Sequence, residues 1–224
     1  MKKRSVLRTA SLAIAVLAVM ASGLPAQAAS YYHKGTFEAG GGFNIPVSEA
    51  NDYLNSSGTL LIGGGRNLGQ SSTIQVEWTH NWLAIDPAVI ERAQSDSVTF
   101  DDAHASLWSV TLNFVRRINP SSDIVPWFTG GIGYYKRNLQ ITQNAYVYYP
   151  PIWDPWWGWI DGGWAPGEVI TGSRETSGFG FNVGGGFDTQ IDSGASLFID
   201  IRYHQAFLDG VDVTLIPIMA GIRW

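Results

Sequence analysis

The sequence predicts an all-β chain in which eight antiparallel strands close into an up-and-down barrel. Three observations lead to this prediction. Apolar and polar residues alternate with a period of two in eight separate segments. After the first 29 residues, no apolar run reaches the roughly 18 residues that a membrane helix needs. The last segment alternates to the end of the sequence and finishes on an aromatic residue, Trp224.

The first 29 residues predict a secretory signal peptide that is removed on export. Basic residues from Lys2 to Arg8 precede a short apolar stretch from Ala10 to Met20, and Ala26-Gln27-Ala28 fits a small-x-small cleavage site. The apolar stretch is too short for a spanning anchor and is followed by Gly23 and Pro25. We therefore expect a leader over residues 1–29 and one barrel domain over residues 30–224.

The composition of the remaining chain excludes several classes of function. Ten Lys and Arg remain against 19 Asp and Glu, a formal charge of −9, which argues against nucleic acid as a partner. There is no cysteine and no metal-ligand spacing among the histidines, so no cofactor or metal is expected. Charged residues are only 15%, against about 25% in soluble domains. An exported chain of this kind can face lipid only as a closed sheet.

The eight strands are each expected to present one apolar face and one polar or glycine-rich face. Ile74, Val76 and Trp78, for example, oppose Gln75 and Glu77. About ten residues is the length that a tilted strand needs to cross a bilayer, and an even number of strands is typical of bacterial barrels. In chain order the expected strands cover residues 37–45, 59–66, 74–82, 108–114, 127–134, 179–188, 197–204 and 214–224.

The connections between these strands are alternately short and long. Turn-rich stretches at 67–71, 119–123 and 190–194 are short, and outer loops are expected at about 46–57, 84–103 and 140–175. The last connection, near 208–211, is also short. Short periplasmic turns alternating with long outer loops are typical of outer-membrane barrels. This pattern predicts the outer membrane of a Gram-negative-type bacterium, with both termini in the periplasm.

A soluble lipocalin-type barrel would show the same alternation with its apolar face turned inward. Two features favour the membrane barrel. The polar face is rich in glycine and carries charges that suit a narrow hydrated lumen. Aromatic residues lie near the strand ends on the apolar face, as in interfacial girdles, at Trp82, Phe114, Tyr134, Phe187, Tyr203 and Trp224. On the last strand Ile218, Ala220, Ile222 and Trp224 share that face, and we expect this end to be the signal that the barrel-assembly machinery recognises.

Three strands also carry a family resemblance. The segment Pro126–Tyr135, P-W-F-T-G-G-I-G-Y-Y, resembles the fifth strand of small outer-membrane barrel proteins such as the opacity-type and OmpA-like surface antigens. Phe179–Phe187 resembles their glycine-rich sixth strand, and Phe198–Tyr203 their seventh. The resemblance covers about residues 34–224 outside the loops. It implies the fold and the location, in a family that includes adhesins, resistance factors and narrow pores.

The expected loop 140–175 contains the first candidate site, because five tryptophans lie within twelve residues there. Such side chains form either a recognition surface for a host surface or a neighbouring envelope protein, or a flap that covers the barrel mouth or rests in the lipid headgroups. The prolines in the segment argue against one long regular strand. The candidate interaction residues are Tyr146, Tyr148, Tyr149, Trp153, Trp156, Trp157, Trp159 and Trp164.

A second candidate site consists of charged residues that share the inward parity of their strands. They are expected to pair across the lumen as a structural plug, or else to gate a narrow passive channel. These residues are Glu38, Glu77, Arg137, Asp188, Asp200, Arg202 and Arg223.

An enzymatic role is a third alternative, because some barrels of this resemblance deacylate lipid A with a lipid-facing His and Ser two residues apart. The matching stretch here is Arg202-Tyr203-His204-Gln205-Ala206, in which Ala206 takes the place of the serine and His204 has the inward parity. A nucleophile is therefore missing, and no enzyme is predicted. The sequence favours a structural or surface-interaction role, with membrane lipid and lipopolysaccharide as its surroundings.

Overall fold

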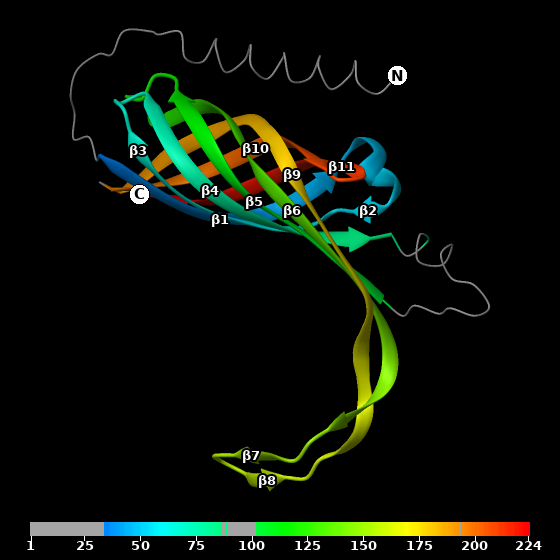
Figure 1. The fold of residues 1–224 in the computed structure, drawn as a ribbon. Helices are drawn as coiled ribbons and strands as arrows, with labels where there is room; N and C mark the ends of the chain where they lie inside the picture. Colours follow the sequence, from blue (N-terminus) through cyan, green and yellow to red (C-terminus); the bar gives the residue numbers. More distant parts are fainter. Residues whose placement is uncertain (1–33, 87, 89–101, 193) are drawn as a thin grey trace.

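The computed structural model describes residues 34–86, 88, 102–192 and 194–224, and in them the chain forms a closed antiparallel sheet (Figure 1). Each strand of the barrel wall pairs with its neighbour in the sequence, and β1 pairs with β11 to close the ring. The predicted eight-stranded up-and-down barrel is therefore confirmed. Its strands are β1 (Gly35–Pro46), β3 (Ser57–Asn67), β4 (Ser72–Ile85), β5 (Asp102–Arg117), β6 (Ile124–Tyr149), β9 (Gly163–Asp192), β10 (Ala195–Leu208) and β11 (Val211–Arg223).

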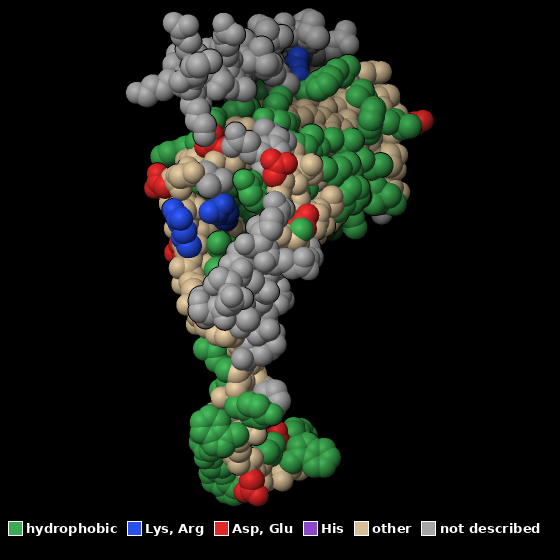
Figure 2. Space-filling view, turned by 90° about the vertical axis from the view of Figure 1, so that its right-hand side faces the viewer, with side chains coloured by type: hydrophobic (Ala, Val, Ile, Leu, Met, Phe, Trp, Pro, Cys, Tyr) green, Lys and Arg blue, Asp and Glu red, His purple; other side chains and the backbone are tan. Residues whose placement is uncertain are grey.

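The alternating polar and apolar residues of the sequence lie on the inner and outer faces of the barrel wall, respectively. Along β4, Gln75, Glu77 and Thr79 are buried inside, whereas Ile74 and Val76 are exposed on the outside. The outer surface of the barrel is largely apolar, as the space-filling view shows (Figure 2). No helix within the described ranges has the length and apolar content needed to cross a bilayer.

The start of β1 and the end of β11 lie at the same end of the barrel, which we call the terminal end (Figure 1). The backbone N–H of Trp224 donates to the carbonyl of Phe37 at 2.8 Å, and the Phe37 N–H donates to the Trp224 carbonyl at 3.0 Å. Their rings also pack with centroids 5.7 Å apart. The last residue therefore takes part in the closure of the ring. The predicted leader over 1–29 lies outside the described residues.

The opposite end, which we call the hairpin end, carries the longer connections. The predicted loop 46–57 holds a 3₁₀ helix, η1 (Ser48–Asp52), and the short strand β2 (Leu54–Asn55), which pairs with the end of β4. Most of the predicted loop 84–103 lies outside the described residues, and the strands that flank it end and begin near the expected positions. The connection from β10 to β11 is a two-residue turn, Asp209-Gly210, in which Gly210 adopts φ +87°.

The prediction of a loop over residues 140–175 is wrong. Strands β6 and β9 stay paired up to Tyr149 and Gly163, well past the barrel wall, and a small hairpin of β7 (Ile152–Asp154) and β8 (Gly158–Ile160) forms the tip. The prolines do not break this ribbon because most of them lie between β6 and β7 or in the tip turn. Pro166 lies inside β9, where the edge that would face β10 is unpaired and no N–H is needed.

Several inward glycines leave room for the large side chains that fill the barrel. At Gly184 an added Cβ would lie 2.3 Å from the Ile201 carbonyl oxygen and 2.6 Å from Arg202 Cγ. At Gly69, in the β3–β4 turn, an added Cβ would meet nothing within 4 Å. The two positions therefore form a matched pair for testing how tightly the wall is packed.

We expect Gly184→Ala to lower the free energy of unfolding by about 1–3 kcal/mol, because the new methyl group overpacks the wall against backbone atoms. Gly69→Ala should leave stability unchanged. Urea unfolding in detergent micelles, followed by tryptophan fluorescence and by the gel mobility of unheated samples, measures both variants. Equal unfolding midpoints for the two variants would contradict the packing argument.

Candidate functional site

The lumen near the terminal end is organised around Arg223. Its guanidinium group donates from Nη1 to both carboxylate oxygens of Asp188 at 2.5 and 2.6 Å, and from Nε and Nη2 to Glu38 at 2.8 and 2.7 Å. The same group lies over the ring of Trp127 at 5.0 Å and over the ring of Phe198 at 5.1 Å. Trp127 Nε1 also donates to Asp188 at 2.9 Å. One arginine thus holds two buried carboxylates between two aromatic faces.

A second centre lies deeper in the barrel, around Arg202. Its guanidinium group forms ion pairs with Glu77 and with Asp200, the latter at 2.6 Å, and all three side chains are fully buried. The Gln75 amide links this centre to the first one, because it donates to Glu77 and, at 3.0 Å, to Glu38. The predicted charges on five different strands therefore meet in a single buried network.

Two differences from the predicted network concern arginines. Arg117 was not predicted, and its Nε donates to Asp188 at 3.5 Å. Arg117 has the inward parity of the expected fourth strand, and extending that strand by three residues, from 114 to 117, includes it. Arg137 was predicted in the network and does not join it: it is paired in register with Leu107 and Thr176, at the hairpin end of the wall. Among the described residues no ion pair connects Arg137 to the other six charges.

Uncharged polar side chains fill the next level of the lumen. The Tyr135 hydroxyl hydrogen-bonds His204 Nδ1 at 3.1 Å, and Asn182 donates to Asn113 at 2.8 Å. His204 is buried inside the wall and Ala206 is fully buried in an apolar cluster beyond it. The two positions that correspond to the His and Ser of a lipid A deacylase, His204 and Ala206, therefore face the lumen, away from lipid.

An apolar cluster fills the lumen towards the hairpin end. Its members come from five strands and are all buried. They lie beyond the polar level, towards the hairpin end, while a smaller apolar cluster of Leu61, Phe198 and Met219 lies close to the charged network. The cluster consists of Leu83, Leu107, Tyr135, Ala206, Leu208, Val213 and Leu215.

The aromatic candidate residues lie together at the far end of the β6–β9 hairpin. The hairpin leaves the barrel at the hairpin end, bends, and carries β7 and β8 well to one side of the barrel (Figures 1 and 2). In this position the hairpin does not cover the mouth of the barrel. From Thr142, the outermost described partner of β5, to Asp154 the ribbon runs for roughly 40 Å at about 3.3 Å per residue.

The aromatic side chains of the hairpin divide into two groups. Trp153 and Trp159 are direct cross-strand partners, and Tyr148 packs edge-on against Trp164 with centroids 5.6 Å apart. Such pairs stabilise the ribbon itself. Tyr146 and Tyr149 are also exposed on β6. Trp156 and Trp157 lie in the tip turn and are the most exposed of these residues, at 88% and 82%, although Trp159 and Trp164 are also mostly exposed.

The conformation of the tip turn keeps these two indoles in solvent. Asp154 Oδ1 accepts hydrogen bonds from the backbone N–H groups of Trp156 at 2.8 Å and Trp157 at 3.0 Å. Gly158, with φ +79°, then returns the chain into β8. The turn is therefore fixed by the Asp154 side chain and by the conformation of Gly158, and the two tryptophan side chains take no part in fixing it.

The fold and the distribution of side chains together define an integral outer-membrane barrel, with apolar residues on its outer wall and a filled polar interior. Comparison with known families agrees: residues 14–223 match the family described as the outer membrane protein beta-barrel domain, and the chain belongs to this family. It is accordingly a protein of the outer membrane of a Gram-negative-type bacterium. A comparison with curated proteins finds no match.

A comparison with solved structures finds other outer-membrane barrels at low sequence identity. Neisserial surface protein A is 12% identical with a TM-score of 0.52, over 85% of this chain and 96% of that chain. The attachment invasion locus protein Ail of Yersinia pestis is 15% identical, with a TM-score of 0.44 over 86% and 100%. The N-terminal barrel domain of Pseudomonas aeruginosa OprF is 9% identical, with a TM-score of 0.42 over 85% and 98%.

We expect Arg202→Met to lower the free energy of unfolding by about 3–5 kcal/mol, because Glu77 and Asp200 would be left buried without their common cation. The control is Lys136→Met, which breaks an ion pair with Glu175 at 2.7 Å whose side chains are 30% and 58% exposed. An exposed pair of this kind contributes about 0–1 kcal/mol. Urea unfolding of both variants in micelles measures the difference. Similar losses of stability in the two variants would contradict the role assigned to the network.

Proposed function

We propose that this protein is a surface-interaction barrel, in which the eight strands anchor the β6–β9 hairpin and the hairpin presents an aromatic tip to a partner outside the cell. In this arrangement the terminal end faces the periplasm and the hairpin end faces outward. The observation that carries the proposal is the exposure of Trp156 and Trp157 at the end of the ribbon. Exposed clusters of large apolar side chains mark interaction sites in folded proteins.

The composition of the tip is consistent with this role. Between Tyr146 and Trp164 the only charged residues are Asp154 and Asp161, and there is no lysine or arginine. Tryptophan provides a large rigid contact area at little cost in conformational entropy, and it is enriched among residues that dominate binding energies. A turn that is fixed by Asp154 and holds two indoles in solvent is therefore suited to binding another surface.

The double substitution Trp156→Ser/Trp157→Ser should abolish attachment of expressing cells to other cells, while the barrel stays folded. Attachment counts on cell monolayers and the gel mobility of unheated protein measure the two effects. Trp156→Phe/Trp157→Phe is the matched control, and it should retain most of the attachment because it keeps two aromatic rings. Attachment that persists in the serine variant would contradict the proposal. Quenching of these two indoles by lipids brominated near the headgroup would also contradict it, because the tip would then rest on its own membrane.

The filled lumen does not favour the alternative of a passive channel. The apolar cluster around Leu107 and Leu215 and the ion pairs of Arg202 and Arg223 occupy the interior along its length. Eight-stranded barrels have an interior just wide enough for side chains to fill. Planar-bilayer recordings of the purified protein should therefore show no discrete conductance steps. Reproducible steps that disappear in a variant of the lumen would reverse this view.

A further inference from the structure

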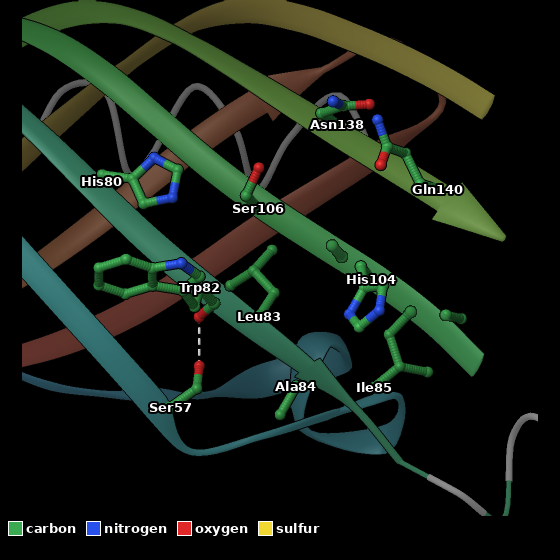
Figure 3. Close-up of a pocket in the computed structure, with 12 residues that line it drawn as sticks. Ser57, His80, Trp82, Leu83, Ala84, Ile85, His104, Ser106, Asn138 and Gln140 are labelled. Carbon is green, nitrogen blue, oxygen red and sulfur yellow. Dashed lines mark hydrogen bonds between the residues drawn. The ribbon is translucent and has the colours of Figure 1, made fainter. Parts of the chain in front are cut away.

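The ladder between β5 and β6 stops before β6 does. Its last pair places Thr142 of β6 opposite the first residue of β5. Figure 3 shows the part of the wall just before this point, where His80 and His104 line a pocket on its outer face. From Gln143 to Tyr149, β6 continues with β9 as its one partner strand among the described residues. We call the side of Gln143–Tyr149 that is turned away from β9 the β6 edge.

The β6 edge presents backbone N–H and C=O groups in a regular pattern. Directly after β5, the Ile118 N–H donates to the Pro126 carbonyl at 2.8 Å, so the even-numbered residues of β6 turn their backbone groups towards β5. The register with β5 then runs without a shift to its last pair. Tyr146 agrees with this parity, because it lies opposite Pro166, which has no N–H to donate to it. The residues of the β6 edge whose N–H and C=O groups point away from β9 are Asn144, Tyr146 and Tyr148.

The two edges of the hairpin differ in the features that prevent strand pairing. The outer edge of β9 over residues 163–177, which we call the β9 edge, contains Pro166, three glycines and three charged residues. A register shift also leaves Thr171 as an extra residue there, which is a β-bulge. The β6 edge, with the sequence Q-N-A-Y-V-Y-Y, has no proline, glycine, charge or register shift. Natural proteins protect their edge strands with these features, so the β6 edge is open to another strand.

We propose that the β6 edge pairs with the β6 edge of a second copy of this chain, in an antiparallel and two-fold symmetric arrangement. When the whole edge overlaps, Tyr146 lies opposite its own counterpart, and Asn144 lies opposite the counterpart of Tyr148. This pairing adds about six backbone hydrogen bonds, two for each hydrogen-bonded pair. It also brings tyrosine side chains into cross-strand contact. Because the segment is uncharged, pairing with itself places no like charges opposite each other.

Two properties of the hairpin favour a second copy over a foreign strand. The hairpin extends to one side of the barrel (Figure 1), so two barrels of one membrane can overlap their ribbons while their walls stay apart. Each hairpin has one open and one protected edge, which ends the assembly at two copies, whereas two open edges would allow continued growth. In the dimer β6 has a neighbour on both sides along its whole length. The contact uses neither Trp156 nor Trp157, so it is independent of the function proposed for the tip.

Disulfide trapping in intact cells tests the proposal, because the chain has no cysteine of its own. Tyr146→Cys should give a disulfide-linked dimer, since the Cα atoms of a hydrogen-bonded pair are about 5.5 Å apart, a distance that a disulfide spans. Ser173→Cys, on the β9 edge, is the matched control and should stay monomeric. Equal dimer yields at the two positions would overturn the proposal, as would linkage of Tyr146→Cys to another envelope protein in place of a second copy.

Proline variants test the same contact without a covalent link. Tyr146→Pro removes an N–H from the β6 edge and leaves the ladder with β9 intact, so it should weaken the dimer about tenfold in native mass spectrometry of micelles. Ser173, opposite Gln140, turns its N–H away from β6, and Ser173→Pro should dimerise like the wild type. The gel mobility of unheated samples verifies that each barrel is folded. Trp156→Ser/Trp157→Ser should also dimerise normally, and loss of the dimer in that variant would place the contact at the tip and overturn the proposal.

Hydrogen exchange uses the unaltered protein, so that it does not depend on the folding of a variant. The amides of Tyr146 and Tyr148 should be protected in the dimer and should exchange rapidly after dilution with detergent, whereas the amide of Ser173 should exchange rapidly in both states. Protection of Tyr146 that persists in the monomer would overturn the proposal, because the chain itself would then cover the β6 edge. A wild type that stays monomeric at every ratio of protein to detergent would also overturn it.

Discussion

The requirement that every backbone N–H and C=O in hydrocarbon be hydrogen-bonded governs the rest of this structure. A sheet meets that requirement only when its first and last strands pair, as β1 and β11 do here from Glu38–Arg223 to Pro46–Leu215. Closure with eight strands fixes a narrow barrel, and a narrow barrel must be filled by its own inward side chains. The need for inward side chains that fill the interior therefore follows from the closure of the ladder.

The way the lumen is filled follows from the same constraint. Large inward side chains such as Arg202 and Trp127 need small neighbours, and Gly184 and Gly186 on β9 provide the space. Four carboxylates and three guanidinium groups then lie in one network, where every charge has a partner of opposite sign. A charge buried without such a partner would cost several kcal/mol. The charged network thus fills the lumen near the terminal end, as the packed apolar cluster fills it near the hairpin end.

The sequence predicts on which face of a strand each residue lies. It does not predict which residues of neighbouring strands lie opposite each other. Alternation alone identified eight strands, assigned Glu38 and Arg202 to the inside, and placed Ile74 and Val76 on the opposite, outer face. It could not show that His80 and His104 share one pocket, because that depends on which residues of β4 and β5 lie opposite each other. It placed Arg137 among the lumen charges for the related reason that parity gives the face of a strand and not the depth in the barrel.

The length of the β6–β9 hairpin was missed for a different physical reason. The prolines argue against a long strand inside a sheet, but a two-stranded ribbon outside the barrel has two free edges, and proline is tolerated in an edge strand, as at Pro166. Such a ribbon is only marginally stable in water without further contacts. The cross-strand pairs Trp153–Trp159 and Tyr148–Trp164 provide such contacts. Trp153, Trp159, Tyr148 and Trp164 therefore stabilise the ribbon by pairing across it, whereas the exposure of Trp156 and Trp157 is explained by neither the fold nor the stability of the ribbon.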